Sequence, residues 1–176
     1  MFIAHLPAGY IISSLLLPRL KCSRIDAKVF MASGALGAIA PDLDIFYFYL
    51  VDHKQHNHHS YFTHFPAFWA SLLLISAIWL YCSRSKTWPA IFTIFCLNGF
   101  GHMVLDTVVG AIQWFAPFLD RYFAFFPIPS LYQPWWLNFI FHWSFALEIG
   151  ILCYAFLLWC RTGNSNAALA PAGVRT

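Results

Sequence analysis

The chain has 176 residues, of which 60% are hydrophobic and only 10% are charged, and its mean hydropathy is +0.64. A soluble globular domain carries about 25% charged residues, so this composition excludes an ordinary soluble domain and indicates an integral membrane protein. The net charge of +3 is too small, and the basic residues are too scattered, to predict nucleic-acid binding.

Five apolar stretches follow one another along the chain, and a spanning helix needs about 20 apolar residues. Their spans are 2–17, 30–50, 65–82, 89–119 and 135–160. The first is short enough to be a partial span, and the fourth is long enough to be tilted or broken near Pro117. They predict an all-α, polytopic membrane bundle of about five membrane-embedded helices over residues 1–162. The small, polar segment 163–176 is expected to be a disordered tail.

The basic residues between the stretches predict the orientation of the chain. If all five stretches span, eight Lys and Arg residues fall on one side, namely Arg19, Lys21, Arg24, Lys28, Arg84, Lys86, Arg161 and Arg175. Only Lys54 and Arg121 fall on the other side. The positive-inside rule assigns the side with eight basic residues to the cytoplasm. We therefore expect a protein of the bacterial cytoplasmic (inner) membrane whose polar residues gather in an outward-facing cavity.

The segment Pro41-Asp42-Leu43-Asp44 interrupts the second apolar stretch. Proline tends to end a helix at the residue before it. Two carboxylates two residues apart in an irregular segment can both point into a cavity. Irregular backbone at membrane depth is tolerated only where it is buried in protein or lines water. A helix cap at the membrane surface is the alternative interpretation.

Five histidines lie between His53 and His64. Neutral imidazole is the commonest metal-ligand side chain, so this segment is a candidate for metal binding. His53, His56 and His58 are also consistent with stray metal binding at the surface. His59 and His64 are better placed to be ligands, because they adjoin the start of the third apolar stretch.

His102 and Asp106 are four residues apart in the fourth apolar stretch. Positions i and i+4 share one face of a helix, so the two side chains can chelate one metal or pair with each other. An acidic residue inside a membrane helix is costly and needs a partner. The same reasoning applies to Glu148, for which a structural ion pair and a metal contact are both open. Gly99 and Gly101 would let another helix or a ligand approach closely.

Together, these side chains offer carboxylate and imidazole ligands. The five cysteines show no CxxC spacing, so thiolates are not expected to contribute. This set of ligands suits zinc, with manganese or iron as alternatives, bound as one ion or as a pair bridged by an aspartate. Such ions lower the pKa of a bound water toward neutrality. Asp42 is then the candidate catalytic residue, because an unligated carboxylate can orient that water as a general base.

The order of His5, Pro41-Asp42-Leu43-Asp44, His59-xxxx-His64 and His102-xxx-Asp106 resembles that of the YdjM-like family of membrane-bound metal-dependent hydrolases. The resemblance covers about residues 1–110, and the family in turn resembles the zinc-dependent phospholipase C and nuclease group. It implies a metal site with candidates at His5, Asp42, Asp44, His59, His64, His102 and Asp106. The family often has an arginine where this chain has Ser60. Because that arginine could grip a substrate phosphate, its absence bears on the substrate and not on the metal.

The sequence therefore predicts a phospholipase-like, metal-dependent hydrolase that acts on a phosphoester or ester of a membrane lipid or lipid-linked substrate at the outer leaflet. Two alternatives remain. The first is a metal or proton transporter, because intramembrane histidines and aspartates also build relays. The second is a non-catalytic membrane protein with a structural metal site. An open coordination position would favour hydrolysis, a second polar cluster on the cytoplasmic side would favour transport, and full ligation would favour a structural role.

Overall fold

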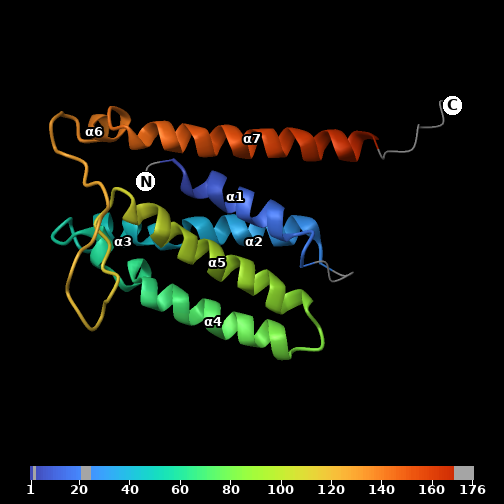
Figure 1. The fold of residues 1–176 in the computed structure, drawn as a ribbon. Helices are drawn as coiled ribbons and strands as arrows, with labels where there is room; N and C mark the ends of the chain where they lie inside the picture. Colours follow the sequence, from blue (N-terminus) through green and yellow to red (C-terminus); the bar gives the residue numbers. More distant parts are fainter. Residues whose placement is uncertain (2, 21–24, 169–176) are drawn as a thin grey trace.

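The computed structural model describes residues 1, 3–20 and 25–168, and in these residues the regular elements are all helices (Figure 1). The elements are α1 (His5–Leu16), α2 (Ala27–Ile39), the 3-10 helix η1 (Pro41–Leu43), α3 (Asp44–Leu50), the 3-10 helices η2 (His58–Ser60) and η3 (Phe62–His64), α4 (Pro66–Cys82), α5 (Thr87–Thr107), α6 (Trp136–Ile140) and α7 (Ser144–Ala168). The predicted all-α class is confirmed.

Two helices are long and apolar enough to cross a membrane alone, namely α5 and the segment Ser144–Thr162 of α7. A third candidate is the pair Ala27–Ile39 and Pro41–Leu50, which is bent by 57°. The bend lies at Pro41, where the sequence predicted a break. The helix α1 has only 12 residues, and α4 is a shorter apolar helix. The described residues therefore contain two or three candidate spans together with shorter apolar helices.

The fourth apolar stretch ends as a helix at Thr107, well before Pro117. The carbonyl groups of Thr107 and Val108 accept hydrogen bonds from the amides of Phe125 and Phe126, both at 2.9 Å. These two carbonyl groups therefore bond to residues 125 and 126 and not to a further turn of α5. The segment after α5 turns back toward the end of the bundle. The expectation of a long helix broken only near Pro117 is therefore wrong.

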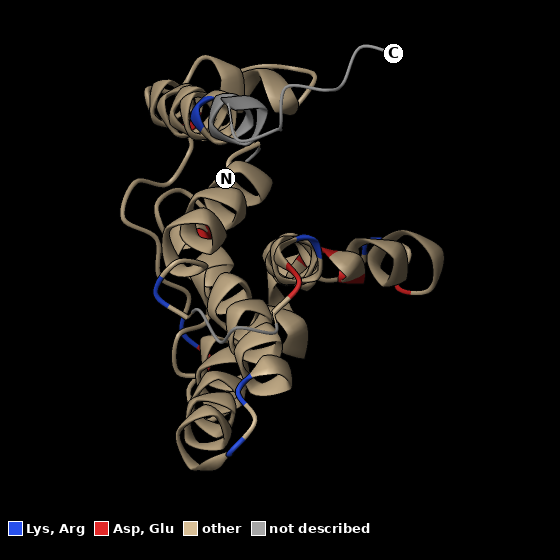
Figure 2. Cartoon of the chain, turned by 90° about the vertical axis from the view of Figure 1, so that its right-hand side faces the viewer, with Lys and Arg blue, Asp and Glu red and all other residues tan. Residues whose placement is uncertain are grey.

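The last helix, α7, runs to Ala168, beyond residue 162, where the tail was expected to begin. Residues 169–176 lie outside the described part of the chain. Figures 1 and 2 show α7 standing apart from the other long helices. It packs chiefly against α1, whereas α2 and α4 both pack against α5. The four remaining long helices therefore form the bundle, and α7 is attached to its edge.

Close helix packing occurs at Gly99, as predicted from the sequence. A Cβ atom there would lie 2.1 Å from Cε3 of Trp69, so the bare glycine lets α4 approach α5. At Gly101 the nearest atom to such a Cβ is Cδ1 of Ile12 at 3.6 Å, which is an ordinary contact. Only Gly99 of the two is therefore required by the packing of the helices.

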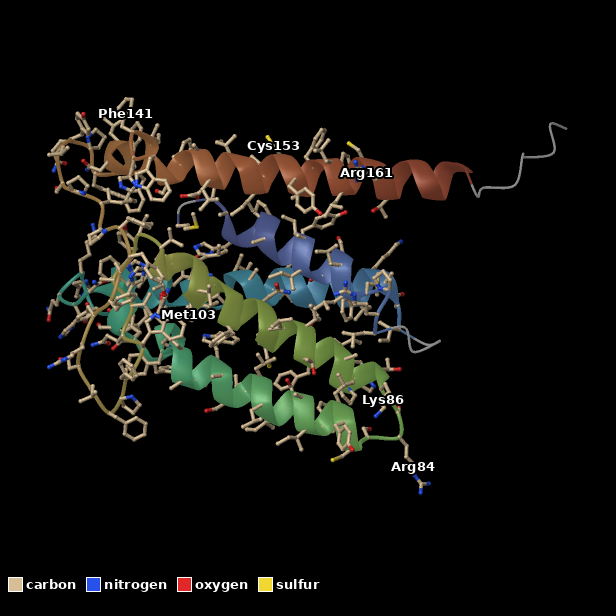
Figure 3. All side chains as sticks on the ribbon, in the orientation of Figure 1. Arg84, Lys86, Met103, Phe141, Cys153 and Arg161 are labelled. Carbon is tan, nitrogen blue, oxygen red and sulfur yellow. The ribbon has the colours of Figure 1, made fainter. Side chains whose placement is uncertain are left out.

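The two ends of the bundle differ in their polar residues. Figure 3 places Arg84, Lys86 and Arg161 toward one end, whereas Met103 and Phe141 lie toward the other. Lys21, Arg24 and Arg175 lie outside the described residues, as does Cys22. The end that contains Met103 also carries α3, the turns η2 and η3 and the N-terminus (Figure 1).

Candidate metal centre

Four side chains converge at the end of the bundle that contains Met103. One ligand atom each from Asp42, His64, His102 and Asp106 lies within 4.8 Å of the others. The residues come from η1, η3 and the last turns of α5. The side chains of His64, His102 and Asp106 are at most 4% exposed, whereas that of Asp42 is 37% exposed. The cluster is therefore closed on three sides and open beside Asp42.

The separations between these atoms suit a small cation. His102 Nε2 lies 3.0 Å from Asp106 Oδ2 and 3.4 Å from Asp42 Oδ1. His64 Nε2 lies 3.6 Å from Asp42 Oδ1 and 4.0 Å from Asp106 Oδ2. Ligands at the usual zinc distances in a tetrahedral site are about 3.3 Å apart. The four atoms thus surround a space of about the right size for zinc.

Hydrogen bonds fix which nitrogen of each imidazole faces this space. Nδ1 of His102 lies 2.7 Å from the carbonyl oxygen of Ala38. Since a carbonyl only accepts, Nδ1 carries the proton. Nδ1 of His64 donates in the same way to Asp44 Oδ2 at 2.6 Å. In the neutral imidazole, the remaining Nε2 of each ring presents a lone pair toward the cluster, as in metal-binding histidines whose other nitrogen is held by an oxygen.

Both of these Nε2 atoms are buried, and neither has a hydrogen-bond partner of suitable geometry among the described residues. A buried polar group without a partner costs about 1–3 kcal/mol. The cost is removed when the lone pair meets a cation. Two such nitrogens aimed at two carboxylates are the strongest local indication of a metal ligand set in this chain.

The charge balance of the cluster also favours a bound cation. Among the described residues, no Lys or Arg forms an ion pair with Asp42, Asp44 or Asp106; the amino group of Met1 pairs with Asp106. Buried carboxylates require a compensating charge. A divalent cation bound between Asp42 and Asp106 would supply it where the side chains do not.

Two further histidines border Asp106. His5 Nε2 lies 3.0 Å from Asp106 Oδ1, and its ring stacks on His102 with centroids 3.7 Å apart. His59 Nε2 lies 3.8 Å from Asp106 Oδ2, and its Nδ1 lies 3.3 Å from the carbonyl oxygen of Ala111. Burial lowers the pKa of His59 to about 3. The ring is therefore neutral at pH 7 and able to donate its lone pair.

All seven predicted site residues thus lie together. Four form the cluster, and His5 and His59 flank Asp106 on its two oxygens. Asp44 lies behind His64 and receives hydrogen bonds from the imidazole and from Thr63 Oγ1, each at 2.6 Å. In this structure Asp44 orients a histidine and does not enter the four-residue cluster.

Three contributors have roles that the sequence patterns did not assign. His58, which the sequence left among the surface histidines, has a ligand atom within 4.8 Å of those of His59 and His64. At Gly110 a Cβ atom would lie 2.8 Å from Cε1 of His59, so the missing side chain makes room for that ring. A glycine after the end of a helix is common and does not by itself predict a site residue. The role of Gly110 depends on its contact with His59, which is distant in sequence.

The third contributor is Glu148 of α7, which is 1% exposed. Its Oε2 accepts hydrogen bonds from the backbone amides of Ile3 at 2.5 Å and Ala4 at 3.1 Å. Ala4, at the N-cap of α1, offers no side-chain cap. Glu148 therefore satisfies amides at the start of α1, directly before His5, and its negative charge suits the N-terminus of a helix.

A cavity of about 720 Å³ adjoins the centre on the side of η1 and η3. It is lined by Leu43, Asp44, Tyr47, Asp52, His56, Ser60, Tyr61, Phe62 and Thr63. Leu43 and Phe62 are 57% and 62% exposed. The lining thus combines apolar and polar side chains, next to the residues that flank Asp42 and His64 in sequence.

The family model described as the YdjM inner membrane protein matches residues 1–169. No curated protein and no solved structure matches the chain significantly.

Proposed function

The chain belongs to the YdjM inner membrane protein family, and we propose that it is a membrane-bound metal-dependent hydrolase. The observation that carries this proposal is a pair of buried Nε2 atoms, on His64 and His102. Both face Asp42 and Asp106, and neither has a hydrogen-bond partner of suitable geometry in the described part of the chain. We propose zinc as the metal, with manganese or iron as alternatives, because carboxylate and imidazole ligands suit these ions.

The bound metal would supply a Lewis acid that polarises a phosphoryl or carbonyl oxygen and acidifies water. The protein side chains would accept the proton and orient the ligands. Asp42 is the most exposed member of the cluster, so it lies where a water molecule and a substrate can arrive. Its Oδ1 faces the two histidines, so the other carboxylate oxygen would accept a proton from the attacking water, as a general base within hydrogen-bond reach does. His102 and His64 would keep their orientation through Ala38 and Asp44.

We propose an amphiphilic substrate, a phosphoester or ester of a lipid or lipid-linked molecule. Support comes from the cavity beside the centre, whose lining includes the apolar side chains of Leu43 and Phe62 and the polar side chains of Ser60 and Thr63. Such a cavity can receive the polar part of a lipid while its apolar part stays in the membrane. Position 60 is a serine and not an arginine, which is consistent with a substrate whose negative charge the metal alone would neutralise.

The experiment begins with the metal content of the purified protein in detergent, followed by hydrolysis of a short-chain phospholipid and a nitrophenyl phosphodiester. Activity should disappear with a chelator and return with zinc or manganese. Asp42→Asn should lower it by at least about a hundredfold, the lower range for loss of a general base. Metal-loaded protein without activity on phosphoester and carboxylic ester panels would contradict the proposal. Metal flux into liposomes under the same conditions would favour a transporter.

We further propose that the centre faces outward. The support is that Arg84, Lys86 and Arg161 lie toward the opposite end of the bundle (Figure 3), and basic residues favour the cytoplasm. Alkaline phosphatase fused after Ser60 should be active, and the same enzyme fused after Ser85 should be inactive. The reverse pattern would move the chemistry to the cytoplasmic side.

A further inference from the structure

A second group of histidines lies beside the metal centre. His58, His59 and His64 each offer a ring nitrogen, and these atoms lie within 4.8 Å of one another. The ring centroids of His58 and His59 are 4.0 Å apart, and those of His59 and His64 are 4.9 Å apart. Three imidazoles at such distances are a ligand set of their own, because imidazole suits zinc and neighbouring transition metals.

The three rings lead inward from the loop to the buried cluster. His58 is partly exposed, and no group among the described residues hydrogen-bonds its ring. The side chain of His59 is 14% exposed, and that of His64 is fully buried. His59 also reaches the cluster, since its Nε2 lies 3.8 Å from Asp106 Oδ2. The group therefore connects the outside of the loop with the carboxylates of the centre.

His64 belongs to both groups, but it can serve only one ion at a time. Its Nδ1 donates to Asp44, so a single lone pair, on Nε2, remains for a metal. An ion held by His58, His59 and His64 and an ion held by Asp42, His64, His102 and Asp106 would compete for that lone pair. The two groups are therefore alternative positions for one ion, and not two sites that fill together through His64.

We propose that His58, His59 and His64 form an access position, which receives a divalent ion from the outside and passes it to the buried cluster. The inference rests on the proposed metal centre. The buried cluster has two carboxylates where the access position has none, so a divalent cation should rest in the cluster. His59 and His64 hold the ion during the transfer, and His58 only receives it. His58 should therefore affect how fast the metal binds and not how tightly it is held.

The test measures metal loading of the full-length, metal-free protein in detergent. Cobalt(II) is the probe, because its absorption reports binding in stopped-flow mixing, and zinc is measured by competition. His58→Ala should slow loading by at least about tenfold, which corresponds to a modest rise in the barrier. Stoichiometry and affinity should match those of the wild type. His58→Cys should restore fast loading, because a thiolate also binds zinc and cobalt.

The control is His53→Asn, in the same loop but outside both groups. His53 has a φ of 49°, and asparagine tolerates this region better than most residues. It should load like the wild type. Equal loading rates for His58→Ala and wild type would overturn the access position. An affinity loss that accounts for the slower loading would also overturn it, because His58 would then be a resident ligand. If the wild type binds no metal at all, the proposed metal centre itself fails.

Discussion

The two halves of the metal centre are built differently. His102 and Asp106 lie one turn apart on α5, a regular helix of 21 residues. His59 and His64 lie on two short 3-10 turns, η2 and η3. The helical half is fixed by the backbone hydrogen bonds of α5. The loop half is fixed by side chains, because Asn57 Oδ1 accepts from His59 N at 3.1 Å and Asp44 accepts from His64.

This difference indicates how the centre assembles. The pair on α5 is in place whenever the helix is, so its geometry does not depend on the metal. The loop half depends on a few hydrogen bonds, each of which contributes about 0.5–1.5 kcal/mol. We therefore expect metal binding to order the loop more than the helix. Changes in the helical half should remove binding, and changes around the loop half should weaken it.

The largest effect is expected for Asp106→Asn, which removes a charged ligand from the helical half. Asp106 faces His102 and His59 with one oxygen and His5 with the other. Metal affinity, measured by titration calorimetry, should fall by more than about a hundredfold, the upper range for outer partners of metal ligands. Asp52→Asn is the matched control, since Asp52 pairs with His56 outside the cluster. Comparable metal binding in wild type and Asp106→Asn would refute the centre.

A smaller loss is expected for Asp44→Asn, which tests how the loop half is held. The substitution weakens the acceptor that orients His64 but leaves all four cluster residues in place. Affinity should fall by about 10–100-fold, the usual range for such partners. Thr63→Val, which removes only the hydroxyl that donates to Asp44, should have a weaker effect. If Asp44→Asn instead equals Asp106→Asn, Asp44 binds the metal directly.

The same division explains what could be predicted from the sequence. The spacing of His102 and Asp106 is a helical repeat, so a local rule predicted that they would meet. Pro41 likewise predicted the break that places Asp42. These features depend only on residues close in sequence, as does the position of His59 and His64 beside the third apolar stretch. The resemblance to a family added His5.

Long-range contacts could not be predicted in this way. Glu148 accepts hydrogen bonds from the amides of Ile3 and Ala4, which are 145 and 144 residues away in the sequence. The sequence indicated that it needs a partner, but its partners are backbone groups, which no motif identifies. Gly110 acquires its role only because the segment after α5 lies against His59 of η2. The end of α5 at Thr107 was missed for the same reason, since its carbonyl is satisfied by Phe125.

Glu148 should influence the centre through α1. Glu148→Ala leaves the amides of Ile3 and Ala4 without this acceptor, at a cost of about 1–3 kcal/mol in stability. Hydrogen exchange at these amides should accelerate in the metal-free protein. Glu148→Gln retains an oxygen acceptor and should behave more like the wild type. Metal affinity should also fall in Glu148→Ala, but not when His5→Ala is already present. Equal losses in both backgrounds would show that Glu148 does not act through His5.

The smallest effect is expected for Gly110→Ala, because its new Cβ would crowd the ring of His59 in the loop half. The new Cβ would lie 2.8 Å from Cε1 of His59 and 3.0 Å from the carbonyl oxygen of Asp106. The ring of His59 must shift, whereas His102 and His64 are untouched. Metal affinity should fall by up to about tenfold, equivalent to ~1.4 kcal/mol. Gly101→Ala is the matched control, because its Cβ meets only Ile12 at 3.6 Å. If Gly110→Ala in a His59→Ala background lowers affinity as much as it does alone, the effect does not pass through His59. The contact between Gly110 and His59 would then contribute little to metal affinity.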